Sequence, residues 1–123
     1  MIGTVEEHIM SHYEPDNWVI VKFEGKTPHY KVLAGWSGGY LSGSSWRMNS
    51  GIVEVQEDED YWIFIGDSGS KYACHKDGYG LRMNNVHVWN QLEDIHKDKV
   101  TLMDEGVDWM SVDWLIKRKD ATQ

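Results

Sequence analysis

Short apolar runs bounded by turn residues recur between residues 18 and 103 and predict strands. The run at 18–23 (WVIVKF) is β-branched and aromatic, and the turn-rich residues 24–28 favour a hairpin with the next run. The segment YWIFI (61–65) is apolar at every position, so we expect a central strand covered on both faces. We expect strands at residues 18–23, 30–34, 52–55, 61–65, 71–75 and 100–103.

The N-terminal segment has helical rather than strand signals. Thr4 and Glu7 have the spacing of a capping box, in which each side chain satisfies a backbone group at the start of a helix. The helix they begin is predicted to reach about Tyr13, because Pro15 ends it.

A second helix is predicted near residues 86–96, where apolar residues recur at helical spacing after Asn84 and Asn85, either of which can cap it. The last segment, 110–116, is ambiguous: its apolar residues alternate as in a strand, whereas Asp108 can cap a short helix. We favour the strand. The expected fold is α+β, a curved and mostly antiparallel sheet with an N-terminal helix and this second helix.

Composition adds bounds on partners and compartment. The 123 residues fit one domain (1–123), and the formal charge of −8 argues against duplex nucleic-acid binding. The single cysteine, Cys74, and the absence of a signal-peptide pattern lead us to expect a cytoplasmic protein. No apolar run approaches the length of a membrane span, so we expect no membrane partner.

The glycine-, serine- and tryptophan-rich stretch 35–51 is the first candidate site. Its glycines let backbone approach a ligand, its rings can stack on a base, and an arginine can hold phosphate. If residues 45–49 are extended, Trp46 faces away from Arg47. The alternative is a wide structural turn whose rings cap the end of a sheet. The candidate ligand-binding residues are Trp36, Tyr40, Trp46, Arg47, Asn49, Ser50 and, from a second polar cluster before the second helix, Arg82. A homodimer can complete such a site, because exposed rings need cover.

Two other motifs are weaker candidates, one for a metal site and one for a catalytic site. His8 and His12 lie four residues apart, a zinc-ligand spacing, but no third ligand is evident and we expect no metal or other cofactor. A hydrolase using Asp67, Ser68 and His75 is the third functional reading, and we nominate no catalytic residue.

The acidic turn of Glu57, Asp58, Glu59 and Asp60 is the second candidate site. Such a run is either a solvated turn or an anionic surface that occupies a basic groove on another protein.

The strings GWSGGYLSGSSWRMNSGI and GDSGSKYACHKDGYG, within about residues 30–80, resemble small accessory proteins of tailed bacteriophages. This resemblance implies a protein in the host cytoplasm that blocks or sequesters a host component. Some such proteins bind signalling nucleotides without hydrolysing them, and others cover a nucleic-acid groove of an enzyme with negative charge. Our first hypothesis is therefore a non-catalytic binder of a nucleotide-like ligand. The alternative is an acidic module that blocks a basic site on a host protein.

Overall fold

A computed structural model describes residues 12–25, 28–39 and 43–114, and the following bounds refer to them. The strands are β1 (His12–Tyr13), β2 (Asn17–Phe23), β3 (His29–Gly39), β4 (Gly43–Met48), β5 (Ile52–Glu57), β6 (Tyr61–Gly66), β7 (Lys71–His75) and β8 (Val100–Leu102). The helix is α2 (Val86–His96), with single 3-10 turns η1 (Lys76–Gly78), η2 (Lys97–Lys99) and η3 (Trp109–Ser111).

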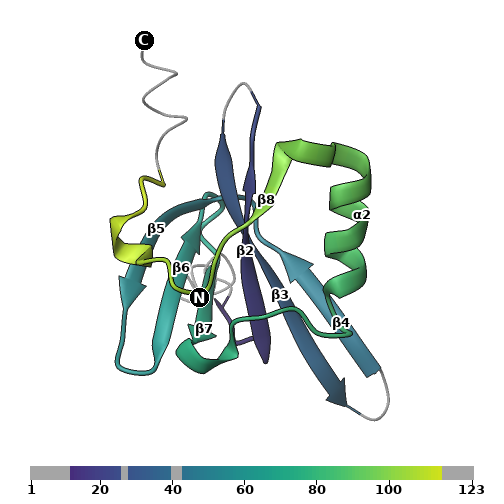
Figure 1. The fold of residues 1–123 in the computed structure, drawn as a ribbon. Helices are drawn as coiled ribbons and strands as arrows, with labels where there is room; N and C mark the ends of the chain where they lie inside the picture. Colours follow the sequence, from purple (N-terminus) through teal and green to yellow (C-terminus); the bar gives the residue numbers. More distant parts are fainter. Residues whose placement is uncertain (1–11, 26–27, 40–42, 115–123) are drawn as a thin grey trace, which may run out of the picture.

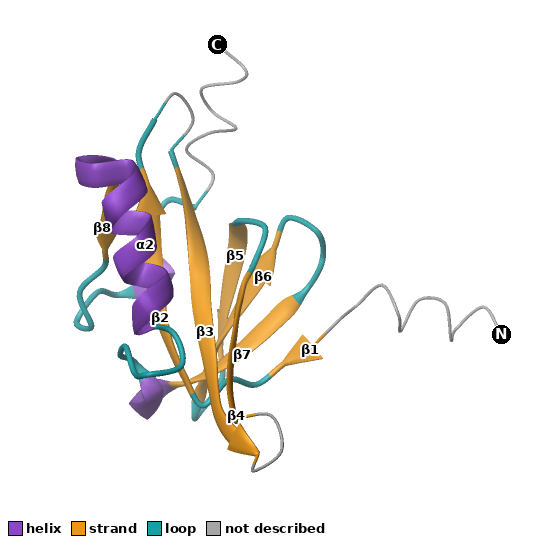
Figure 2. Cartoon of the chain, turned by 90° about the vertical axis from the view of Figure 1, so that its right-hand side faces the viewer, coloured by secondary structure: helices purple, strands orange, loops and turns teal. Residues whose placement is uncertain are grey.

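The strands form two four-stranded sheets. Sheet A has the order β1-β7-β6-β5, and sheet B has the order β4-β3-β2-β8. All neighbouring strands pair antiparallel except β1, which lies parallel to β7. Sheet B lies between sheet A and α2, so the fold has three layers (Figures 1 and 2).

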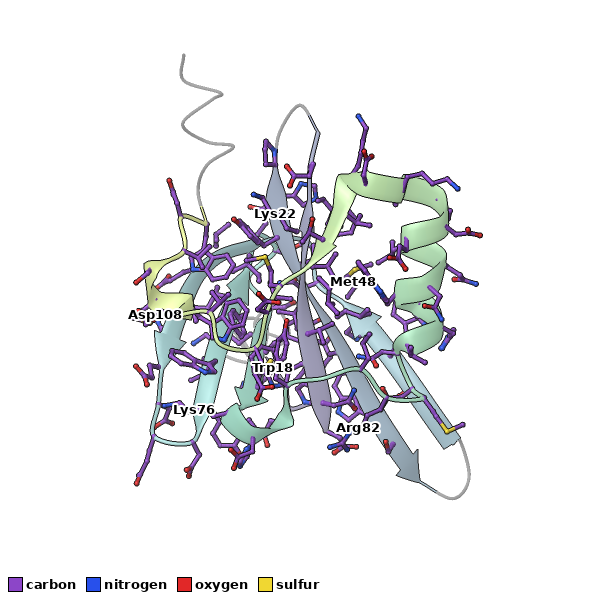
Figure 3. All side chains as sticks on the ribbon, in the orientation of Figure 1. Trp18, Lys22, Met48, Lys76, Arg82 and Asp108 are labelled. Atoms are coloured by element: carbon purple, nitrogen blue, oxygen red, sulfur yellow. The ribbon has the colours of Figure 1, made fainter. Side chains whose placement is uncertain are left out.

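Strand β2 supplies both cores, because its side chains alternate between the two faces of sheet B. Trp18 and Ile20 face sheet A, whereas Val19 and Val21 pack with Val88 of α2. Figure 3 shows Trp18 between the sheets and Met48 between sheet B and the helix. This double burial explains the uninterrupted apolar run of β2.

The core between the sheets is largely aromatic. The ring centroid of Trp18 lies 5.4 Å from that of Phe64 and 6.0 Å from that of Trp109, and the Trp109 and Trp114 rings stack at 6.3 Å. The segment after β8 thus closes the core over β5.

The α+β class, the mostly antiparallel sheets and the helix near 86–96 are confirmed, as are the six main strands. The capping prediction needs correction. Asn85 is the N-cap residue of α2 but makes no side-chain cap bond, because its side chain bonds to Leu33 O and Arg82 N instead.

The N-terminal helix lies almost wholly outside the described residues, which begin at His12. Its predicted end at Tyr13 is wrong. His12 and Tyr13 form β1 beside Lys71 and Tyr72 at the edge of sheet A.

The strand favoured for residues 110–116 is also wrong where it is described. Asp108 begins η3, and its carboxylate accepts from Met110 N at 3.1 Å. The apolar alternation predicted that Met110 is buried, but Met110 is 52% exposed and its neighbour Trp109 is buried at 2% exposure.

Two further expectations change. The stretch 35–51 is not a wide loop, since β3 runs on to Gly39 and β4 pairs with it, with an irregularity between Trp36 and Gly39. Strand β6 is central, but its two faces are covered unequally. Phe64 is buried in the core, whereas Ile63 and Ile65 on the other face stay half-buried.

Candidate functional site

The β3–β4 hairpin separates the residues of the first candidate site. Gly35 lies opposite Trp46, and Ala34 lies opposite Arg47. Because neighbouring residues alternate in direction, Arg47 and Trp36 share the face toward sheet A, while Trp46 points to the other face, as the extended geometry predicts. Trp36 and Trp46 therefore cannot form two walls of one pocket within the chain.

Arg47 packs into an aromatic cluster at the edge of the two sheets. Its guanidinium carbon lies 4.7 Å from the centre of the Tyr13 ring, which is 6.3 Å from Trp36 and 4.8 Å from Tyr72. Burial raises the pKa of Tyr72 to about 12, although the positive charge of Arg47 acts in the opposite direction. Among the described residues Arg47 has no ion pair.

Asn49 and Ser50 serve the crossover from sheet B to sheet A. Asn49 is buried, and its Oδ1 accepts from Val32 N at 3.0 Å, whereas its Nδ2 has no partner. Ser50 Oγ accepts from Ser68 N at 3.1 Å. Tyr40, the remaining stacking candidate of the loop, lies outside the described residues.

Arg82 belongs to the opposite side of sheet B from Arg47. It leads into a buried amide cluster, in which Asn84 Nδ2 donates to Asn17 Oδ1 at 2.7 Å and Asn17 Nδ2 donates back to Asn84 Oδ1 at 3.1 Å. Asn84 lies over Gly35 on the helix-side face. The two arginines therefore do not flank one phosphate site. Figure 3 shows Arg82 near the start of α2.

The acidic turn connects β5 to β6 and is exposed throughout. Asp58 N donates to Tyr61 O at 2.9 Å, which closes the turn. Lys76 is bound to this region twice, through Nζ to Glu57 Oε2 at 2.7 Å and through its backbone N–H to Asp60 O at 2.9 Å (Figure 3). The nearest described lysine is thus already occupied.

A cavity of about 270 Å³ opens beside this turn, lined by Glu14, Pro15, Asp16, Tyr61 and His75. The Tyr61 and His75 side chains face each other across β6 and β7, with ring centroids 5.3 Å apart. We call the cavity and the carboxylates of its adjoining segments the acidic end. Glu14 and Asp16 line the cavity, and the adjoining turn and η1 contribute Glu57, Asp58, Glu59, Asp60 and Asp77.

The segment carrying Glu14 and Asp16 is held to sheet B at several points. Asp16 N donates to Gly35 O at 2.9 Å, and Asp16 Oδ2 accepts from Ser37 N at 2.7 Å. Trp36 Nε1 donates to the carbonyl of Glu14 at 3.1 Å. These bonds set the position of one cavity wall without using both oxygens of either carboxylate.

The outer face of sheet A continues from the cavity. The pair Ile63–Ala73 follows the pair Tyr61–His75, and the pair Ile65–Lys71 comes next. Polar residues from β5 border this apolar centre, with Gln56 opposite Ile63 and Glu54 opposite Ile65. An apolar centre with a polar rim is typical of a protein interface.

Sequence reasoning identified the acidic turn but did not connect it with Glu14, Asp16, Tyr61 or His75, the last of which it named only for the hydrolase hypothesis. They are up to 61 positions apart, and only the pairing of β1, β6 and β7 brings them together. The sequence signal that could have indicated part of the site is the hairpin register that places Tyr61 opposite His75.

The structure does not bring together the residues of the hydrolase hypothesis. Ser68 and His75 stand at opposite ends of β7, and Ser68 Oγ contacts Ser70 Oγ at 3.4 Å rather than an imidazole. Cys74 is fully buried, and burial raises the pKa of its thiol well above the ordinary value. In the described residues no group of three or more His, Cys, Asp or Glu side chains is placed to hold a metal ion.

Comparisons with known proteins identify no relative. The chain matches no protein-family model, no curated protein and no solved structure. Within the described residues, no helix combines the length and hydropathy that crossing a membrane requires.

Proposed function

We propose that this chain is an acidic interaction module that binds a basic surface of another protein through the acidic end and the adjoining outer face of sheet A. The observation that carries the proposal is that Glu14 and Asp16 line one cavity together with Tyr61, which directly follows the acidic turn, and His75, which directly precedes η1. Glu14 and Asp16 precede β2, the acidic turn joins β5 to β6, and Asp77 lies in η1. The sequence implies only the turn.

Two features favour a partner over a merely solvated surface. Lys76 forms an ion pair with Glu57. Among the described residues, no lysine or arginine forms an ion pair with any other carboxylate of the acidic end. The neighbouring Ile63 and Ile65 are half-buried and supply an apolar centre that a partner can cover. Charge complementarity then gives fast association and orientation, while burial of the centre gives affinity. If the phage resemblance holds, the partner is a host protein.

The test is the affinity of a fluorescein-labelled deca-arginine peptide, measured by anisotropy over a range of salt concentrations. Asp58→Lys with Glu59→Lys should weaken binding at least tenfold and reduce its salt dependence. Glu93→Lys with Asp94→Lys changes net charge equally on exposed positions of α2 and should stay within twofold of the parent. Equal losses in both double variants would show that only net charge matters and would refute the proposal.

A second candidate, a nucleotide-like small ligand, is favoured by one observation. Arg47 stacks on Tyr13 beside Trp36 without an ion pair among the described residues, although the chain is acidic. The experiment is a thermal-melt panel of mono-, di- and cyclic nucleotides and nucleotide sugars. A stabilising compound should lose its effect in Arg47→Ala and Trp36→Ala but retain it in the opposite-face control Trp46→Ala. Retention in all three variants rejects this site.

A further inference from the structure

We propose that the cavity at the acidic end receives one arginine side chain of the basic partner, an inference that rests on the proposed function for the kind of partner. The cavity volume of about 270 Å³ lies just below the range of about 300–1,000 Å³ found for small-molecule pockets. A cavity of this size accommodates a single protruding side chain.

The lining selects a cation. Glu14 and Asp16 contribute two carboxylates, whereas no lysine or arginine of the described residues lines the cavity. Asp16 uses Oδ2 to accept from Ser37 N, and Glu14 Oε2 contacts His12 Nε2 at 3.4 Å. The other oxygen of each carboxylate has no described hydrogen bond, so each can accept from a ligand.

The aromatic wall favours a guanidinium over an ammonium. Tyr61 contributes an aromatic ring to the lining, and arginine stacks on rings while its planar N–H fork binds carboxylates. Lysine presents a more strongly hydrated point charge and gains less from this combination. Pro15, which also lines the cavity, provides apolar surface for the aliphatic stem.

The cavity is prepared before binding. Asp16 is held by Gly35 O and Ser37 N, and a Cβ added at Gly78 would come within 3.0 Å of Asp16 O. The η1 turn and the Asp16 segment are thus in direct contact, so little ordering is required when a side chain enters. Preorganisation of this kind improves affinity by reducing the entropy lost on binding.

The experiment uses N-acetyl-arginine N-methylamide as the probe and its citrulline analogue as an uncharged isostere. Amide chemical shifts of the ¹⁵N-labelled chain are followed during titration, with Ser37 as the reporter because its N–H bonds to Asp16. The arginine probe should shift Ser37 and the amides of Tyr61 and His75 in a saturable manner, and citrulline should bind at least fivefold more weakly. Equal binding of the two probes, or shifts confined to other residues, would overturn the inference.

Matched variants separate the cavity from its surroundings. Glu14→Gln with Asp16→Asn removes two charges while leaving an acceptor for Ser37 N, and should weaken the arginine probe at least fivefold. Asp58→Asn with Glu59→Gln removes the same charge outside the cavity and should stay within twofold. Equal effects of the two double variants would also overturn the inference.

The two proposals fail in different ways. If deca-arginine binding depends on the turn but the single-arginine probe does not reach the cavity, the interaction module stands and the arginine receptor does not. If the probe binds in the cavity while reversal of Asp58 and Glu59 has no specific effect on deca-arginine, the proposed function is refuted instead.

Discussion

Replacing Gly35 by alanine should destabilise the protein strongly, although both residues are small. A Cβ at Gly35 would lie 2.0 Å from Asn84 Oδ1 and 2.4 Å from Asn84 Cγ, well inside any allowed contact. Asn84 is 1% exposed, and its amide bonds to Asn17 in both directions and to Ser37 Oγ at 3.1 Å. The added methyl group must therefore displace a buried amide from three hydrogen bonds.

The magnitude follows from those bonds. At about 1 kcal/mol for each hydrogen bond, with more for any buried group left unpaired, the loss is about 3–5 kcal/mol. Domains of this kind have a total stability of about 5–15 kcal/mol, so the change is a large part of it. The melting temperature should fall by about 10 °C or more.

Urea unfolding and calorimetry of Gly35→Ala measure the loss, with Gly106→Ala as the control. A Cβ at Gly106 meets no atom within 4 Å, so that variant should stay within about 0.5 kcal/mol of the parent. Asn84→Ala removes the obstructing amide, so the double variant Gly35→Ala/Asn84→Ala should cost clearly less than the sum of the single changes. Additive costs, or a Gly35→Ala protein as stable as the Gly106→Ala protein, would refute the steric reasoning.

Three further changes test other contacts. Tyr79→Phe removes the hydroxyl that accepts from Ile20 N at 3.3 Å and donates to Met103 O, and urea unfolding should show a loss of about 1–3 kcal/mol. Burial raises the pKa of Tyr72 and of Tyr79 from 10.0 to about 12, so folding favours the protonated phenols. Their contribution should be complete below pH 10 and decline as the pH rises to 12, which urea midpoints across that range will measure; a flat profile would contradict it. Asp108→Ala removes the acceptor for two groups of η3, Met110 N and Ser111 Oγ, and should cost about 0.5–2 kcal/mol by calorimetry, whereas Asp108→Asn should restore most of it.

Strands β2, β5, β6 and β7 could be predicted because each is a short, largely apolar run bounded by turn residues, and helix α2 because its apolar residues recur at helical spacing. Strand β4 was not predicted, because its glycine and serine residues have low strand propensity. It forms because it pairs with β3. The C-terminal prediction failed because apolar alternation indicated Met110, whereas the aromatic core is filled by Trp109. Tertiary packing decided that segment, not local pattern.

The candidate site divides in the same way. The turn at Glu57–Asp58–Glu59–Asp60 is a contiguous run and was visible. The cavity wall formed by Asp16 depends on contacts with Gly35 and Ser37, and no spacing rule connects those positions. Arg47 and Arg82 do not share one ligand site, because the Arg47 side chain points to the sheet A face of sheet B whereas the segment before α2 lies on the helix face.

The alternating side chains of β2 have a consequence for cooperativity. Trp18 and Ile20 belong to the core between the sheets, and Val19 and Val21 belong to the core under α2, so neither core can be lost without disturbing the same backbone. We therefore expect the helix layer and sheet A to unfold together rather than as separately melting units. The backbone amides of β2 should exchange with solvent only through global opening. Their exchange rates should therefore report the free energy of unfolding of the whole domain.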